Sequence, residues 1–398
     1  MTSGVQVETP PQVSHREVRA GYIGLLLFSL AHFFIDLYSS GLGSFQPLLV
    51  QKFGLSMTQA GLLGGALVFS SSLVQPAYGY LSDRFHSKLF SALAPAMAGI
   101  FISCLGIASG FGSLVVMVIL GGVGIASFHP QASARATLGI ETNRGKWFAV
   151  FISAGTLGMA IGPTFFSSVL GRVGLERSWL AAIPGVLATV ALLFLLPELS
   201  AESPHRQNKF AWEPFKAVWK PLTILYFLVF IRSIVQVTYA QFLPLYLNRE
   251  RGYTYESSTH ILSLYLTAGA LGGFAGGYLA DRIGGRRVIL LSMIGCVPFL
   301  AVFFLTGGVT SVLGLVLGGL MLLFTIPVNV VMGQQLAPSQ AGTVSALMMG
   351  FAWGMAGLIF IPLTGWIADH YSLRTALGIL TVFPVLGFVL AYMLPKEM

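Results

Sequence analysis

Charged side chains are scarce in this sequence. Asp, Glu, Lys and Arg make up 9% of the 398 residues, whereas soluble domains carry about 25%. Because so few charges cannot cover the surface of a water-soluble globular fold, that class of protein is excluded. Disorder is excluded as well, since 55% of the residues are apolar and disordered chains are poor in such residues. The composition is that of a polytopic membrane protein.

Cysteines are rare, and the motifs of common enzymes are missing. Cys104 and Cys296 lie far apart in apolar runs, which argues against a disulfide framework or a metal site. The sequence contains neither the G-x-x-x-x-G-K-[ST] loop that binds ATP nor the H-E-x-x-H and G-x-S-x-G motifs of hydrolases. Its basic residues flank the apolar runs without a nucleic-acid motif. We therefore expect no catalytic residue, no bound metal, no cofactor and no nucleic-acid partner.

Long apolar runs are abundant instead. A run of about 20 residues lets a helix cross ~30 Å of hydrocarbon, and these runs lack the ten-residue alternation of membrane β-barrels. The fold class predicted is an all-α membrane protein with twelve transmembrane helices in two six-helix bundles. Breaks at charges, Gly and Pro place the spans at residues 21–49, 57–81, 88–109, 112–136, 146–170, 178–197, 221–247, 257–280, 287–306, 309–334, 341–367 and 374–395.

The distribution of Lys and Arg predicts the orientation. Loops on the side of the N-terminus carry 15 of the 22 basic residues, the opposite loops carry six, and Arg232 lies inside a span. The positive-inside rule then places both termini in the cytoplasm. The only long polar stretch between spans is residues 198–220, so we expect a tail at 1–20, one bundle at 21–197, a cytoplasmic linker at 198–220 and a second bundle at 221–398.

The two halves of the chain repeat each other. GYLSDRFHSK at Gly79–Lys88 recurs as GYLADRIGGRR at Gly277–Arg287, at an offset of 198 residues. Pro47 and Pro244, and Arg177 and Arg374, recur at an offset of 197. Two parallel repeats about an axis along the membrane normal are typical of secondary transporters, whose site lies between the halves.

These segments carry a resemblance to a known family. Gly277–Arg287 resembles the loop signature G-x-L-x-D-R-x-G-R-R of the major facilitator superfamily, and the first copy departs from it after Arg84. The segments Gly121–Ala136, which contains FHPQAS, and Gln340–Ser372 are similar to the fosmidomycin-resistance subfamily of bacterial drug exporters. The resemblance covers nearly the whole chain and implies proton-driven export of small molecules across the bacterial inner membrane.

The resemblance also implies roles for helix ends and for a glycine-rich helix. Four charged residues are expected to latch the halves together in the outward-facing state, unless they are only a solvated face: Asp83, Arg84, Asp281 and Arg282. In the fifth span, the GMAIGP segment with Gly158, Gly162 and Pro163 resembles the antiporter signature of drug/proton exporters. Tight helix packing alone is the other interpretation of this segment.

Three residues are candidates for carrying the coupling proton. Asp36 lies in the middle of a span, where a carboxylate costs at least ~2.5 kcal/mol, and such a residue is a functional candidate. His32 lies one helical turn before Asp36 and could pass it a proton or only orient it. His129 precedes the helix-bending Pro130. Alternatively, Asp36 is a structural carboxylate hydrogen-bonded to a neighbouring helix, and His129 caps the backbone carbonyls that Pro130 leaves free.

Arg232 and several uncharged polar residues are candidates for binding the substrate. The Arg232 guanidinium needs an anion, which could be Asp36, a substrate phosphonate or carboxylate, or cavity water. A purely structural Arg–Asp pair across the halves is the alternative. Weaker candidates, which could equally make helix–helix hydrogen bonds, are Gln75, Tyr38, Gln46, Tyr239 and Asn329.

Taken together, these features predict a proton-coupled antiporter that exports a small drug-like or anionic compound by alternating access. Its partners would be this small molecule, protons and the lipid bilayer, and its energy source would be the proton gradient. We expect a monomer. Proton-symport uptake of an organic acid or sugar is the alternative, and a membrane sensor that transports nothing is a third hypothesis.

Overall fold

The computed structural model describes residues 15–85, 87–140, 142–197 and 212–395. Within these ranges every regular element is a helix, and twelve helical spans are long and apolar enough to cross a membrane. The predicted all-α class and the predicted number of spans are therefore confirmed. Most of the expected linker lies outside the described residues, and its last part is the start of helix α9 at Glu213.

Six spans form the N-terminal half. In chain order they comprise α1 (His15–Ser39) with α2 (Gly41–Phe53); α3 (Met57–Val68), η1 (Phe69–Leu73) and α4 (Gln75–Phe85); α5 (Leu89–Ser103) with η2 (Cys104–Ile107); α6 (Phe111–Arg135); α7 (Arg144–Val173); and η3 (Leu175–Ala182) with α8 (Ile183–Leu195).

Six further spans form the C-terminal half. They comprise α9 (Glu213–Glu250); α10 (Tyr255–Ile283); α11 (Gly285–Leu305); α12 (Gly308–Leu322) with α13 (Thr325–Leu336); η4 (Pro338–Gln340), α14 (Ala341–Ser345), η5 (Ala346–Ala352) and α15 (Trp353–His370); and α16 (Leu373–Leu380) with α17 (Phe383–Tyr392).

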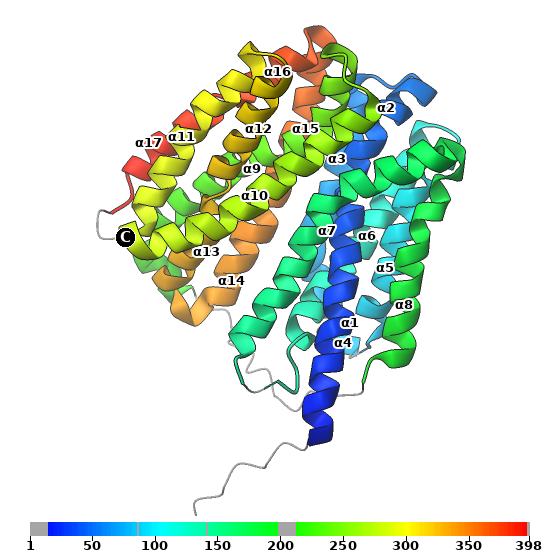
Figure 1. Cartoon of the computed structure of the whole chain (residues 1–398). Coiled ribbons are helices and arrows are strands. Elements are labelled where there is room, and N and C mark those ends of the chain that lie inside the picture. Colours follow the sequence, from blue (N-terminus) through cyan, green and yellow to red (C-terminus); the bar gives the residue numbers. More distant parts are fainter. Residues whose placement is uncertain (1–14, 86, 141, 198–211, 396–398) are drawn as a thin grey trace, which may run out of the picture.

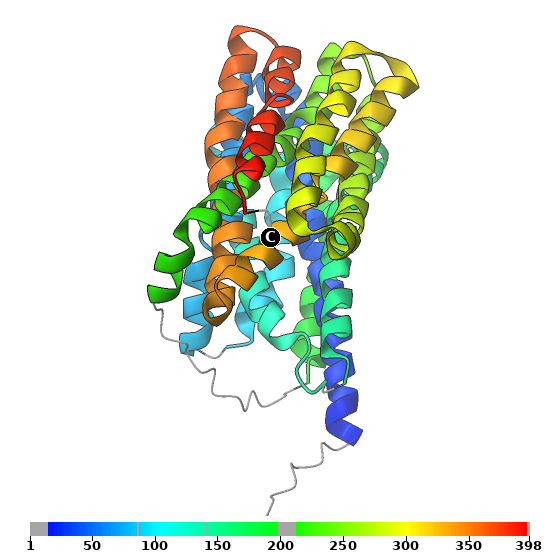
Figure 2. The ribbon, with the colours of Figure 1, turned by 90° about the vertical axis from the view of Figure 1, so that its left-hand side faces the viewer.

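The two halves stand side by side with their helices running roughly along one direction (Figures 1 and 2). We call the side at which α1 begins the near side, and the opposite side, where α2 ends and α16 begins, the far side. In Figure 1 the near side is at the bottom and the far side at the top.

The most extensive helix contacts between the halves are α3 with α15, α7 with α10, and α2 with α9. Glycines allow two of these backbones to approach closely. A Cβ on Gly61 of α3 would lie 2.7 Å from the carbonyl oxygen of Ile361, and one on Gly365 of α15 would collide with the carbonyl oxygen of Met57. Small residues at such contacts let membrane helices pack backbone to backbone, so these glycines form the seam between the halves.

Two spans contain a π-helical turn where they border the space between the halves. In the second span η1 directly precedes the turn at Val74 and the Gln75–Pro76 pair, and in the eleventh span η5 directly precedes Trp353. Such turns are frequent at functional sites because they break the regular backbone bonding of a helix. They lie in contact with each other across the halves.

Candidate functional site

A cavity of about 770 Å³ lies between the halves, within the size range of pockets for drug-sized molecules. It extends from the middle of the molecule towards the near side, where Gly79 and Gly342 line it. Most of its wall is apolar. Among the described residues that line it, the ionisable side chains are His32, Asp36 and His129.

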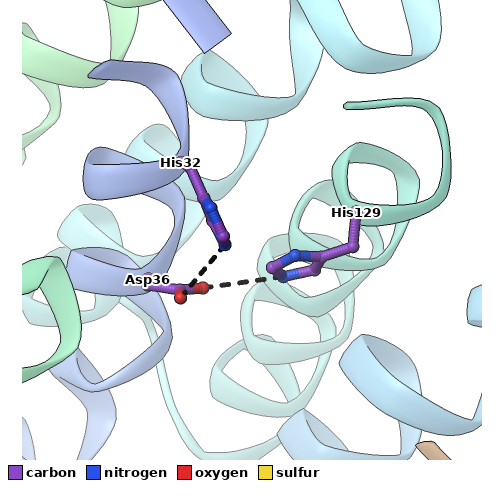
Figure 3. A group of neighbouring side chains, drawn as sticks. All are labelled: His32, Asp36 and His129. Carbon is purple, nitrogen blue, oxygen red and sulfur yellow. Dashed lines mark ion pairs between the residues drawn. The ribbon is translucent and has the colours of Figure 1, made fainter. Parts of the chain in front are cut away.

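These three side chains converge from two helices, α1 and α6 (Figure 3). Asp36 Oδ2 lies 3.4 Å from His32 Nε2, and Asp36 Oδ1 lies 3.6 Å from His129 Nε2. His32 and Asp36 are 5% and 8% exposed. The structure therefore brings together all three residues that the sequence proposes for proton coupling, with the carboxylate between the two imidazoles.

The backbone carbonyl of Phe151 on α7 determines which nitrogen of His32 carries a hydrogen. This oxygen lies 2.9 Å from His32 Nδ1, and a carbonyl oxygen can only accept, so Nδ1 is the donor. The other nitrogen, Nε2, faces the Asp36 carboxylate. An imidazole nitrogen without a hydrogen and a carboxylate oxygen are both hydrogen-bond acceptors, and their lone pairs repel each other. Their close approach is therefore favourable only when a cation lies between them. A proton on Nε2 or on the carboxylate supplies that cation.

The third helix at the cluster, α7, stacks Phe151 on His32 and presents a glycine to Asp36. A Cβ on Gly155 would lie 2.5 Å from Asp36 Oδ2 and would also collide with His32 Nε2. One and two turns further along α7, Gly158 and Gly162 lie against the α1 backbone, at the carbonyl oxygens of Phe33 and Leu37. The glycine-rich helix thus packs closely on α1 and leaves room for the cluster.

The same cluster could hold a metal ion. One ligand atom from each of His32, Asp36 and His129 lies within 4.8 Å of the others, and imidazole with carboxylate suits Zn²⁺ and related ions. A backbone carbonyl on the remote nitrogen, as at His32, is common among metal-binding histidines. A metal ion and a shared proton are therefore two chemically distinct occupants of this cluster.

Arg232 lies in the other half, behind the cavity wall. It is 4% exposed. Its Nη1 donates to Gln236 Oε1, and its guanidinium carbon lies 5.4 Å from the ring centre of Trp353. Gln236 and Trp353 line the cavity, whereas the Arg232 Nε has no hydrogen-bond partner among the described residues.

The Arg232–Asp36 pair considered above does not form among the described side chains, where the ion-pair partners of Asp36 are His32 and His129. The repeat gives a physical reason for this. At the offset of 197, Arg232 corresponds to Ile35 and not to Asp36, and adjacent residues of a helix point to different faces.

Of the weaker candidates, Gln75 lines the cavity. Its amide donates to the Ser71 carbonyl oxygen at 2.8 Å and thereby supports the irregular turn of the second span. Ser39, Ser40 and Gln241 also line the cavity. Sequence reasoning singled out neither serine, because serines are common throughout this chain and carry no periodic signal.

The other four weak candidates lie away from the cavity lining. Tyr38 donates to the Ala181 carbonyl oxygen, Gln46 donates to the Ala60 carbonyl oxygen, and the Tyr239 hydroxyl bonds Thr381 and Leu377. These three side chains thus donate hydrogen bonds to neighbouring elements of the fold, whereas Gln46 Oε1 has no partner among the described residues. Asn329 is fully buried in α13, and neither polar atom of its side chain has a hydrogen-bond partner within the described part of the chain.

The expected latch residues lie on the near side. The Arg282 guanidinium lies over the ring of Tyr278 at 4.4 Å, and Arg84 lies beside Phe85. The Asp83 side chain is outside the described residues. Since the latch with Asp281 is expected for the outward-facing state, it stays a prediction for that state.

Comparisons with known proteins match nearly the whole chain. A sequence model described as the Major Facilitator Superfamily matches residues 28–361. The chain is 28% identical over 389 residues to the fosmidomycin resistance protein of Escherichia coli (strain K12), covering 94% of this chain and 92% of that protein. It is 29% identical over 383 residues to the uncharacterized MFS-type transporter YfnC of Bacillus subtilis (strain 168), covering 94% and 93%.

A solved structure has the same fold. It is that of a bacterial homologue of the human lysosomal transporter Spinster, in an inward-facing and unoccupied conformation. The match has a TM-score of 0.80 at 16% identity and covers 96% of this chain and 97% of that one.

Proposed function

This chain belongs to the Major Facilitator Superfamily, as its loop signature predicts, and we propose that this multi-pass membrane transporter is a proton-coupled antiporter that exports a small organic compound. The observation that carries the proposal is the His32–Asp36–His129 cluster at the wall of the cavity between the halves. A buried carboxylate with two imidazoles in a substrate cavity can take up and release protons where substrate binds.

Alternating access supplies the mechanism. The halves meet along the α3–α15, α7–α10 and α2–α9 seams, and the cavity extends to the near side. Rocking of one half against the other would close the near side and open the far side. The predicted near-side latch, with Asp281 and Arg282, would form in that second state.

The two walls of the cavity suit different parts of a substrate. Gln236, held by the buried charge of Arg232, suits an acidic group on the C-terminal wall. A hydrogen-bond donor of the substrate that reaches Asp36 would replace the coupling proton, and this mutual exclusion is what an antiporter requires. The apolar lining, with Leu67, Phe351 and Trp353, suits the body of a drug-like compound.

Proton symport of an organic acid remains the second candidate, and Arg232 is the observation that favours it. Asp36 does not neutralise Arg232, so the guanidinium can attract an anion to the wall beside Gln236. The bound anion would add negative charge to the cavity. A negative charge stabilises a nearby proton, so an anion could bind together with the proton instead of replacing it.

The direction of export comes from the similarity to the fosmidomycin resistance protein. We propose the bacterial inner membrane as the location, with both termini in the cytoplasm, from the Lys and Arg bias of the loops. The near side would then face the cytoplasm. The proton gradient is the proposed energy source, and the proposed unit is a monomer.

Flux measurements in proteoliposomes test the function. Fosmidomycin is the first compound to test, because the chain is similar to a fosmidomycin resistance protein. A panel of organic acids and amphipathic drugs follows. An antiporter accumulates substrate in vesicles that are acidic inside, whereas a symporter does so when the outside is acidic. Asp36→Asn should abolish the part of the substrate flux that the proton gradient drives. If Asp36→Asn retained full gradient-driven flux, Asp36 would not be the coupling residue.

A further inference from the structure

Asp369 connects the two halves on the far side of the molecule. It is the penultimate residue of α15, in the C-terminal half. Its Oδ1 accepts from the Met57 amide at 2.7 Å. Its Oδ2 accepts from the Thr58 amide at 2.8 Å and from the Thr58 hydroxyl at 2.6 Å. Since all three donors belong to α3 of the N-terminal half, one carboxylate bridges the halves.

The bridge completes the capping of α3. The first amides of a helix have no partner within that helix. Ser56 caps the Gln59 amide at 3.0 Å, and the Gln59 side chain accepts from the Ser56 amide at 3.0 Å. The amides of Met57 and Thr58 are not capped from within the half, and both donate to the Asp369 carboxylate. The N-terminal half therefore has a fully capped α3 only while the other half lies against it.

Electrostatics favours the same contact. The N-terminus of a helix carries a partial positive charge of about half an elementary charge, which a carboxylate stabilises. Gly365 lies one turn before Asp369 and permits the approach, because a Cβ there would collide with Met57. Gly365 thus sets the separation of the helices, and Asp369 makes the polar contact.

The α7–α10 seam is built differently. At the offset of 197, Arg172 corresponds to Asp369, and a cation cannot accept from a helix N-terminus. The N-terminus of α10 is capped by its own Thr254, which accepts from Ser257 at 3.1 Å. On the α7–α10 seam, the hydroxyl of Thr164 instead lies 2.8 Å from that of Ser263.

We propose that Asp369 is a gating residue whose negative charge holds the far side closed. It sets the balance between the state described here and the state that opens to the far side. The inference rests on the alternating access of the proposed function, but it requires neither proton coupling nor a particular substrate.

Disulfide cross-linking across the α7–α10 seam tests this role. In a full-length background with Cys104→Ala and Cys296→Ala, the substitutions Thr164→Cys and Ser263→Cys place two thiols where the hydroxyls now meet. Their oxidation rate reports how often the far side is closed. Asp369→Asn, which keeps the shape of the side chain, should slow cross-linking by up to about fivefold, the limit set by one charge at a helix N-terminus. Asp369→Glu should restore part of the rate.

Glu250 provides a matched control. Its carboxylate accepts from the amides of Leu373 at 2.7 Å and Arg374 at 2.9 Å, and so caps α16 within one half. Glu250→Gln removes the same kind of contact without touching the α3–α15 contact, and it should leave the cross-linking rate unchanged.

The proposal is overturned if Asp369→Asn cross-links at the rate of the background, or if Glu250→Gln slows cross-linking as much as Asp369→Asn does. Because the assay uses neither substrate nor a pH gradient, its outcome is independent of proton coupling. Failure of Asp36→Asn to affect transport would therefore not be confused with failure of the gate.

Discussion

His32 donates its Nδ1–H to the backbone carbonyl of Phe151, and this bond turns its Nε2 towards Asp36. Phe151 also stacks on the imidazole, with ring centres 4.4 Å apart. The ring of His32 is thus fixed in position and in tautomer by one residue of α7. A histidine held in this way can orient Asp36, and it can also exchange a proton with it.

Two substitutions of His32 separate these roles. Asn keeps an N–H near the position of Nδ1, and Gln keeps a polar group near the position of Nε2, but neither side chain titrates. We expect both variants to reduce gradient-driven flux at least tenfold, about 1.4 kcal/mol. Exchange of labelled substrate without a gradient should continue. If His32→Gln supports normal gradient-driven flux, His32 only orients Asp36.

Gly155 is predicted to be essential for the shape of the cluster. The Cβ of Gly155→Ala would lie 2.5 Å from Asp36 Oδ2, and such overpacking costs roughly 1–3 kcal/mol. The carboxylate must then move away from His32, so gradient-driven flux should fall strongly. Gly145→Ala is the control on the same helix, because a Cβ there meets nothing within 4 Å. Equal flux in the two variants would show that the close approach of α7 is unimportant for coupling.

Metal removal distinguishes the two occupants of the cluster. If a proton is shared between Asp36 and the histidines, protein treated with a strong chelator and reconstituted in metal-free buffer should transport at its normal rate. Metal content by mass spectrometry, measured on the same sample, shows that removal was complete. Loss of flux that Zn²⁺ restores would identify the cluster as a metal site and contradict the proton interpretation.

The sequence predicts the spans and part of the site, because these depend on short segments of the chain. Apolar length alone determines which segments can cross a membrane, and the helical spacing of His32 and Asp36 places them on one face. The contact between Asp36 and His129 was not predictable, although both were candidates. It depends on how α1 and α6 are rotated against each other, which is a property of the whole bundle.

The contact of Asp369 with α3 was even less predictable from the sequence. It is separated from Met57 by 312 residues, and in the sequence it is one acid at the end of an apolar run. Tyr38 shows the opposite case, because a mid-span hydroxyl resembles a substrate contact until the structure gives it the Ala181 carbonyl. Polar residues within spans can thus be found from sequence, but their partners come from tertiary packing.

Arg232 supports a last prediction about substrate charge. The guanidinium is buried, holds Gln236 and lies against Trp353, while its Nε has no hydrogen-bond partner in the ranges that the structure describes. A buried cation of this kind stabilises an anion at the adjacent wall, and the planar fork of Arg makes it stronger than Lys.

Arg232→Lys keeps the charge but removes the fork that holds Gln236. The Kd of an anionic substrate should therefore rise about tenfold, or roughly 1.4 kcal/mol, while the Kd of a neutral analogue should change little. Binding by thermal shift at several ligand concentrations gives both values. Arg172→Gln, at an exposed arginine on the far side, controls for the general loss of positive charge. If anionic and neutral ligands lost the same affinity in Arg232→Lys, Arg232 would support the shape of the cavity wall and not the charge of the substrate.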